Sequence, residues 1–298
     1  MTVLEWYRHH TELHNYKMNQ LYKMVKITKQ GHYKRLALAQ RDELQKEAIL
    51  SKAAAIRKDH KKMGCRKLYN KISPEGIGRD KTENLLLENG FRLPRPKNYT
   101  RTTYAGKYRF NNLISDKSFD GINQLWVSDI TYITVGYKKY YYLTLVQDVY
   151  SRMVVGWSLS DTMLTEHTVA EAYKNAIKTR ACDLEGLVFH SDRGSQYGSE
   201  LMQALHKSHK VNPSMGNKAW ENAHAESING VLKNEYISLP QTGKIIKLKT
   251  ARKYMENWIR LYNDHRPHGS LKNQEPTKFE TFVEGLAPLQ RPIVKINY

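Results

Sequence analysis

The chain has 298 residues, with 48 lysines and arginines against 29 aspartates and glutamates, and a net charge of +19 at pH 7. Its hydrophobic content of 40% excludes global disorder. Its two cysteines form no CxxC motif, which disfavours a disulfide framework or a cysteine zinc site. The excess of positive charge favours a polyanionic partner, with nucleic acid ahead of an anionic membrane.

The first hundred residues hold 22 lysines and arginines against ten acidic residues. Residues 1–45 have apolar residues at helical spacing with a break at Gly31, which predicts a helical segment with the outline of a helix-turn-helix. Residues 46–92 predict a second such unit, with Gly90 as the C-terminal cap of its last helix. The helices of this unit are expected in AILSKAAAIRKDH, CRKLYNKI and RDKTENLLLENG, with SPEGIG as a turn.

The last of these helices is the expected recognition helix, since its first turns carry residues suited to DNA contacts. These residues are Arg79, Lys81, Thr82 and Asn84. A basic helical bundle that joins subunits is the alternative. Residues 93–120 are rich in Pro, Arg, Lys, Asn and Tyr, and predict a basic linker along a phosphate backbone.

Residues 121–282 predict an α/β core, followed by a short extended tail at 283–298. Three closely spaced β-like runs come first and indicate an antiparallel meander. These runs are LWVSDITYITV, YYYLTLVQDVY and RMVVGWSLS. Helices then alternate with two short extended segments, GLVFH and VNPSM, and ENAHAESINGVLKNEYI is expected to form one helix.

Two aspartates lie where strands are expected. Asp129 lies within a run that is apolar on both parities, which indicates a central strand buried on both faces. An unpaired carboxylate there is costly, so a purely structural Asp129 would need a partner cation or a strand end, and metal coordination explains it at least as well. Asp192 follows GLVFH, at the strand end where α/β sheets place their sites, although a turn or N-cap aspartate is equally compatible.

The third acid, Glu226, lies on an amphipathic helix. Glu226, Asn229 and Lys233 share its polar stripe, and Ala225 and Ile228 begin the opposite apolar one. Glu226 and Lys233 are about 10 Å apart along the helix at about 1.5 Å per residue, too far for an i,i+4 pair. A solvated face is the usual explanation of such a stripe; a metal-binding acid beside a phosphate-binding lysine also uses this separation.

Three carboxylates offer oxygen ligands for Mg²⁺, for which Mn²⁺ can substitute. Two such ions about 3.5–4 Å apart can activate an attacking oxygen and stabilise a leaving one in a phosphoryl displacement. The serines near Asp192 form no assembled Ser-His-Asp order, and no tyrosine has the Arg/His framework of a tyrosine recombinase.

Several ordered motifs resemble the insertion-sequence transposases of the retroviral-integrase-like superfamily, of the type encoded by the second reading frame. The similarity covers roughly residues 45–282, and residues 1–45 match least. The motifs are KKMGCRKLYNKI, WVSDITYI, YYLTLVQDVYSRMVVGWSLS, HSDRGSQY, NAHAESINGVLKNE and YNDHRPHGSLKNQEPTKF. Asp192 and Glu226 are separated by 33 residues, slightly fewer than is usual in the family, and Glu221 lies where an aspartate is more common.

This resemblance implies an RNase-H-like core, with a mixed five-stranded sheet flanked by helices, preceded by the all-α helix-turn-helix segments. It implies that Asp129, Asp192 and Glu226 are the catalytic, metal-binding acids with two Mg²⁺ ions, and that Lys233 contacts the element-end DNA. We also expect Arg193, next to Asp192, to contact DNA. The implied reaction is cleavage at the element ends followed by 3′-OH strand transfer.

The implied partners are inverted-repeat end DNA, target DNA and further copies of the chain on DNA. Members of this type often also depend on a separate upstream-frame DNA-binding protein or a frameshifted fusion to it, and residues 1–45 are expected either to replace that protein or to connect to it. We expect a cytoplasmic, nucleoid-associated bacterial protein without a membrane partner. Two alternatives stay open: a nuclease of the same fold that does not join strands, and a DNA-binding repressor with an inactive core.

Overall fold

The computed structural model describes residues 16–93, 110–136, 139–216, 219–236 and 246–297, together with Trp6 and His10. The α-helices are α2 (Met18–Met24), α3 (Lys29–Asp59), α4 (Cys65–Ile72), α5 (Arg79–Glu88), α6 (Val169–Arg180), α7 (Glu200–Ser208), α8 (Ala223–Val231), α9 (Leu248–His265) and α10 (Pro276–Glu284). The strands are β1 (Ser118–Phe119), β2 (Leu125–Gly136), β3 (Lys139–Asp148), β4 (Val154–Ser160), β5 (Val188–Ser191), β6 (Asn212–Met215) and β7 (Val294–Lys295).

The N-terminal helices differ from the expected break at Gly31. The chain leaves the helical state between Met24 and Lys29, and Thr28 caps α3 by accepting a hydrogen bond from the Gly31 N–H at 3.0 Å. Gly31 therefore lies in the first turn of α3, where the N-cap decides the start of the helix. One helix then continues to Asp59, across the expected boundary at residues 45 and 46.

The end of α3 forms a three-helix unit with α4 and α5. Its small core contains Ile49, Ala53, Met63, Leu68 and Leu86. Gly90, at φ +83°, ends α5 as predicted. The N–H groups of Phe91 and Gly90 donate to the carbonyls of Leu86 and Leu87, which is the Schellman arrangement that a left-handed glycine permits.

The core sheet has the strand order β4-β3-β2-β5-β6. β3 is antiparallel to both β2 and β4, whereas β5 is parallel to β2 and β6 is parallel to β5. This mixed five-stranded topology is the predicted RNase-H-like one. β2 lies at its centre, as its apolar residues on both parities indicated.

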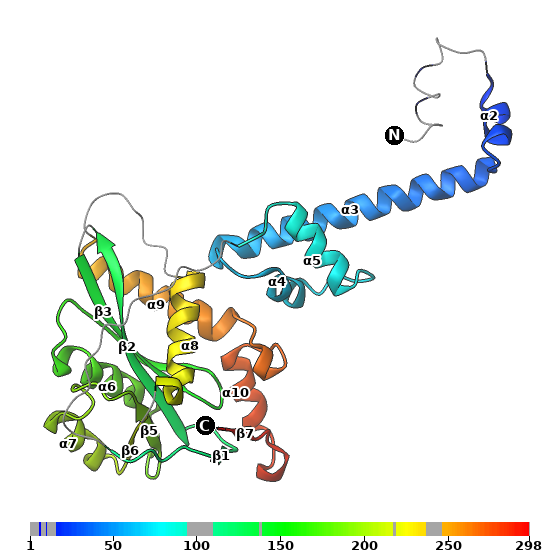
Figure 1. The fold of residues 1–298 in the computed structure, drawn as a ribbon. Coiled ribbons are helices and arrows are strands. Elements are labelled where there is room, and N and C mark those ends of the chain that lie inside the picture. The colour runs from blue at the N-terminus through cyan, green and yellow to red at the C-terminus, as the bar shows by residue number, and fades with distance from the viewer. Residues whose placement is uncertain are drawn as a thin grey trace.

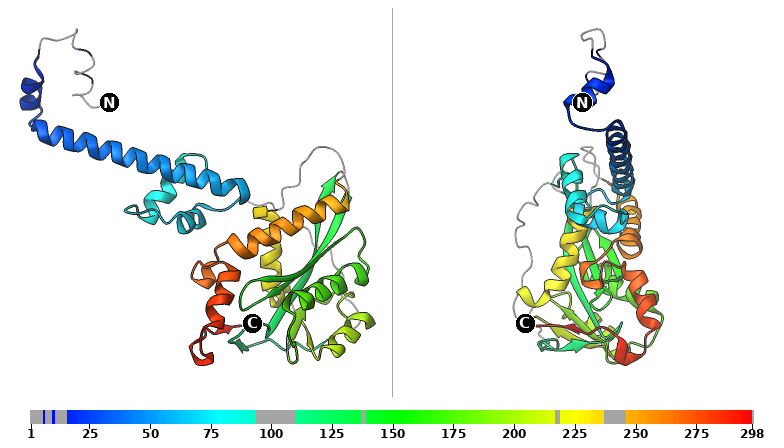
Figure 2. Two further views of the ribbon diagram at one scale, coloured as in Figure 1. Left: turned by 180° about the vertical axis from the view of Figure 1, so that it is seen from behind. Right: turned by 90° about the vertical axis from the view of Figure 1, so that its right-hand side faces the viewer.

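Helices cover both faces of this sheet (Figures 1 and 2). On one face, Trp126 of β2 packs with residues of α6 and α7, including Tyr173 and Met202. On the other face, Ile133 and Val135 of β2 pack against α8 and α9. The alternation of side chains along a strand therefore gives β2 one face toward α6 and one toward α8.

The expected linker and tail both contribute to the core. Phe119 in β1 and Ile114 before it are buried, and β1 pairs with β7 in the expected tail. Residues 94–109 of the expected linker lie outside the described residues. No helix in the described ranges is long and apolar enough to cross a membrane.

Candidate active site

Asp129 lies near the middle of β2, on the face toward α8. Leu125 and Val127 share its parity and pack against Ala225 of α8. The Asp129 side chain is half-buried. Burial, and then the negative charges of Asp192 and Glu226, raises its pKa to about 7.

Asp192 follows the last residue of β5, directly beside β2. Its Oδ1 accepts a hydrogen bond from the Gly194 N–H at 2.9 Å, so a tight turn orients the carboxylate. Burial raises the pKa of Asp192. Behind it, the hydroxyl groups of the buried Tyr197 and Ser128 lie 2.9 Å apart and join this turn to β2.

Glu226 extends from the first turn of α8 and is exposed. Burial of part of its carboxyl group, and then the charge of Asp192, raises its pKa. The three predicted acids, from a strand, a strand end and a helix, therefore act on one another electrostatically. The opposite stripe of this helix is buried, as predicted, through Ala225 and Ile228.

Asn229 has a role here that the sequence did not reveal. It lies on the predicted polar stripe but is buried, and its Nδ2 donates to Asp129 Oδ2 at 2.7 Å. This bond ties the Glu226 helix to the Asp129 strand and favours the charged form of Asp129. The only available signal was the i,i+3 spacing from Glu226.

A buried polar chain also holds the segment before α8. His190 is fully buried and lies between Ser214 and Glu221. Its Nδ1 lies 2.8 Å from Ser214 Oγ, and its Nε2 lies 3.1 Å from the Glu221 carbonyl oxygen. A carbonyl only accepts, so Nε2 carries the proton and Ser214 donates to Nδ1. Burial lowers the pKa of His190 to about 4, which keeps the ring neutral.

Lys233 lies on a π-helical turn, Leu232–Tyr236, that continues α8. The expected single helix is thus wrong, because the hydrogen-bond pattern changes after Val231. The Lys233 Nζ lies 4.7 Å from the centre of the Tyr132 ring on β2. Burial lowers its pKa, and the charge of Asp129 partly opposes this effect.

The donor set suits a hard divalent cation, because carboxylate oxygens are the ligands that Mg²⁺ and Mn²⁺ prefer. Desolvation and mutual repulsion raise the pKa of both Asp129 and Glu226, and a cation would relieve both costs. Within the described residues, the side chains do not form a closed cluster of three metal ligands. The arrangement is therefore chemically suited to metal binding without being a preformed cage.

The helix with the predicted DNA contacts, α5, lies with α3 and α4, away from β2 and α8, which carry Asp129 and Glu226 (Figure 1). Arg79, Lys81 and Asn84 are exposed, and Arg79 pairs with Asp80 at 2.9 Å. Thr82 was predicted wrongly: it is fully buried, and its hydroxyl donates to the Gly78 carbonyl at 3.1 Å. Its short side chain turns back onto the helix start and cannot reach a base.

Arg193 is half-buried beside Asp192. Its Nε donates to the carbonyl oxygen of Gly216 at 3.0 Å, just after β6. This bond fixes part of its guanidinium group at the edge of the site. Lys233 thus lies near Asp129, and Arg193 follows Asp192 directly, whereas the α5 residues lie on the three-helix unit.

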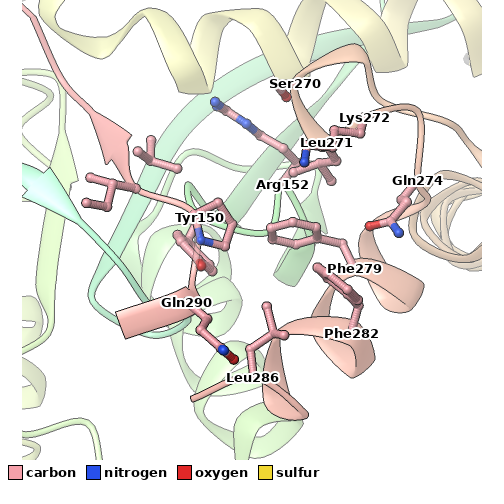
Figure 3. A pocket seen from close by; sticks show the side chains of 13 residues that line it. Tyr150, Arg152, Ser270, Leu271, Lys272, Gln274, Phe279, Phe282, Leu286 and Gln290 are labelled. Carbon is pink, nitrogen blue, oxygen red and sulfur yellow. The ribbon is translucent and has the colours of Figure 1, made fainter. Parts of the chain in front are cut away.

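A separate pocket of about 340 Å³ lies between the β3–β4 turn, α10 and the tail, and contains none of the three acids (Figure 3). Aromatic rings of Tyr150, Phe279 and Phe282 line it, with Arg152 and Lys272 as its cations. Arg152 also bonds to His224 of α8, at 2.5 Å. The pocket therefore adjoins the helix that carries Glu226 but lies outside the acidic site.

Comparison with known proteins identifies the family. The integrase core domain family matches residues 120–219 and again 209–276. A putative transposase for insertion sequence element IS986/IS6110 from Mycobacterium tuberculosis is 31% identical over 77% of this chain and 84% of its own. Transposase InsF for insertion sequence IS3A from Escherichia coli is 27% identical over 87% of this chain and 92% of its own.

Among solved structures, the HTLV-2 integrase catalytic core domain in complex with magnesium is 18% identical, with a TM-score of 0.40, over 57% of this chain and 99% of that one. This likeness is too distant to bear on the mechanism. The sequence relatives and the integrase core match are sufficient to assign the chain to a family. The chain belongs to the insertion-sequence DDE transposases of the integrase superfamily, and it is a DNA transposase, a polynucleotidyl transferase.

Proposed function

We propose that Asp129, Asp192 and Glu226 are the catalytic acids of this transposase and bind two Mg²⁺ ions, or Mn²⁺ in their place. The mutual electrostatic effect of the three carboxylates, which come from β2, from the turn after β5 and from α8, supports this assignment most directly. When bound, the ions supply Lewis acidity at the attacking and leaving oxygens. Asn229 holds the Asp129 carboxylate in one orientation through its 2.7 Å hydrogen bond.

The proposed reaction has two phosphoryl transfers. In the first, a water oxygen bonds to the phosphorus at the element end, the P–O3′ bond breaks, and the strand leaves with a 3′-OH. In the second, this 3′-OH attacks a target phosphodiester, a P–O3′ bond of the target breaks, and a new 3′–5′ linkage forms. The first step is a hydrolysis that consumes one water, breaks one phosphodiester bond and leaves a 5′-phosphate beside the free 3′-OH. The second is a transesterification that keeps the number of phosphodiester bonds and releases a 3′-OH of the target. Neither step needs a covalent protein intermediate.

Lys233 is the proposed contact to the element end. Its amine lies on the acid-bearing side of α8, near Asp129, where a phosphate of the reacting strand would lie close to the carboxylates. Arg193, beside Asp192, is proposed as a second phosphate contact. Arg79, Lys81 and Asn84, exposed on α5, are proposed to bind the inverted repeat.

Two copies or more are proposed to act together on DNA, because two element ends have to be joined to one target. A separate upstream-frame DNA-binding protein is a further proposed partner. Adding that protein to an end-binding assay with the purified chain would test it: tighter or more sequence-selective binding supports the partnership, and unchanged binding opposes it.

The test of the acids uses isosteric variants, Asp129→Asn, Asp192→Asn and Glu226→Gln, with the exposed Glu200→Gln on α7 as a matched control. Each of the three is expected to lose Mg²⁺-dependent cleavage and joining while still binding end DNA. Pre-cleaved ends with a free 3′-OH separate a transposase from a nuclease. Strand transfer that persists in any of the three would overturn its assignment.

A further inference from the structure

The three-helix unit contacts the catalytic core through charged and polar groups. Lys67 of α4 places its Nζ 2.8 Å from Oε1 of Glu235, on the π-helical turn that follows α8. Arg266, just after α9, holds the same carboxylate through Nε at 2.7 Å and Nη2 at 2.8 Å. Glu235 is thus bound by one cation from the core and one from the three-helix unit.

These groups are largely removed from water. The exposed fractions of the side chains are 4% for Arg266, 16% for Glu235 and 29% for Lys67. Burial alone would raise the pKa of Glu235, but the hydrogen bonds and charge of Arg266, and then Lys67, outweigh it and lower the pKa. The carboxylate therefore stays charged and keeps both partners at neutral pH.

A second contact lies one residue further along the turn. The His60 Nδ1 lies 2.9 Å from the Tyr236 hydroxyl, and the two rings meet edge to face at 5.6 Å. Burial, and then the charges of Lys71 and His265, lowers the pKa of His60 to about 4. His60 is therefore neutral near pH 7, and this contact aligns the turn without adding charge.

The same turn carries Lys233. Leu232 and Tyr236 are buried in the core on the inner side of the turn, whereas Glu235 faces the three-helix unit. Lys233 lies between these residues, with its amine over Tyr132 on the Asp129 strand. Single π-helical turns are rare and are frequently found at functional sites. The position of Lys233 therefore depends on the contacts that hold this turn.

We propose that Glu235 is a positioning residue, which Arg266 and Lys67 hold so that the π-helical turn presents Lys233 to the element end. Docking of the three-helix unit then completes the active site of the same chain. The three-helix unit then affects the rate of strand transfer, and not only the affinity for the element-end DNA. The effect on rate rests on the proposed DNA contact of Lys233, but the hold on the turn does not.

The first measurement is hydrogen exchange of the full chain without DNA or metal. Lys67→Met is expected to speed exchange in residues 232–236, and Glu235→Gln should do the same. The control is Lys46→Met, which removes an exposed lysine paired with Glu43 at 3.2 Å on α3. Unchanged exchange in the turn for both interface variants would overturn the proposal, whatever the role of Lys233.

The second measurement compares strand transfer at saturating pre-cleaved DNA with the Kd for the same DNA. Lys67→Met should slow transfer about 10- to 100-fold, because small displacements of a positioning group cost that much. Its Kd should change no more than that of Lys46→Met. A rate loss equal to that of the control would refute the positioning role.

A double variant separates this proposal from the assignment of Lys233. If Lys67 acts through Lys233, Lys67→Met combined with Lys233→Ala is no slower than Lys233→Ala alone. Multiplying effects would show that Lys67 acts by another route and overturn the proposal. If Lys233→Ala alone changes neither rate nor binding, the DNA contact fails, and hydrogen exchange still decides whether Lys67 holds the turn.

Discussion

Replacing Asp129 by asparagine should stabilise the metal-free protein although it removes a catalytic acid. The pKa of Asp129 is raised from 3.8 to about 7 by burial and by the charges of Asp192 and Glu226. At about 1.4 kcal/mol per pKa unit, ionising this carboxyl group costs up to about 4 kcal/mol of stability. Water reaches the half-buried side chain, so we expect about 2–4 kcal/mol.

The pH dependence follows from the sign of the shift. Between the unfolded pKa and the folded pKa of about 7, the unfolded state has lost the proton and the folded state retains it. The unfolding free energy of the wild type should therefore fall, relative to Asp129→Asn, by up to about 1.4 kcal/mol per pH unit and level off above pH 7. Asparagine retains an oxygen that can accept the Asn229 hydrogen bond.

Urea unfolding from pH 5 to pH 8.5 in the presence of EDTA measures this difference. The exposed Asp42→Asn on α3 is the matched control and should track the wild type. Mg²⁺ should then stabilise the wild type more than Asp129→Asn, because only the former keeps all three carboxylates. Equal stability of wild type and Asp129→Asn at every pH, or a difference that shrinks as the pH rises, would refute the reasoning.

Gly156→Ala should destabilise the core by about 3 kcal/mol in urea unfolding, since a Cβ there would lie 2.3 Å from the Ala172 carbonyl oxygen, and an unchanged midpoint would contradict this packing. Arg180→Met should cost about 3–5 kcal/mol by the same assay, because it leaves the buried Asp148 and its neighbour Glu280 without their cation. Asn229→Ala should slow strand transfer about 10- to 100-fold, and a wild-type rate would exclude the orienting bond to Asp129.

The local patterns of the core were strong enough to predict its elements. β2 is apolar on both parities because α6 and α8 cover its two faces, and the acids were visible as polar residues in or beside such runs. The buried stripe of α8 followed from 3.6-residue periodicity. The family resemblance then supplied the mixed five-stranded sheet, and the order of its strands came from the structure.

Other features depend on contacts between distant residues. The hydrogen bond of Asn229 and the neutral state of His190 require partners about 100 and 24–31 residues away, which no local pattern encodes. Thr82 was misplaced because a threonine suits both an exposed first turn and a bond back to the Gly78 carbonyl. The helix break predicted at Gly31 was misplaced because α3 already begins at Lys29, where Thr28 is its N-cap.

The 31-residue helix α3 sets a distance as well as a connection. At about 1.5 Å per residue it is a rod of about 46 Å, as long as about 14 base pairs of B-DNA. Between His32 and Ile49 it has no buried residue. Adding one residue in this stretch would turn α2 by about 100° relative to the three-helix unit, whereas adding four would shift it by about 6 Å with a rotation of only about 40°. The length of α3 thus sets both the distance and the rotation of α2 relative to the three-helix unit. A contact with DNA made at the far end of α3 would therefore be restricted to one face of a duplex.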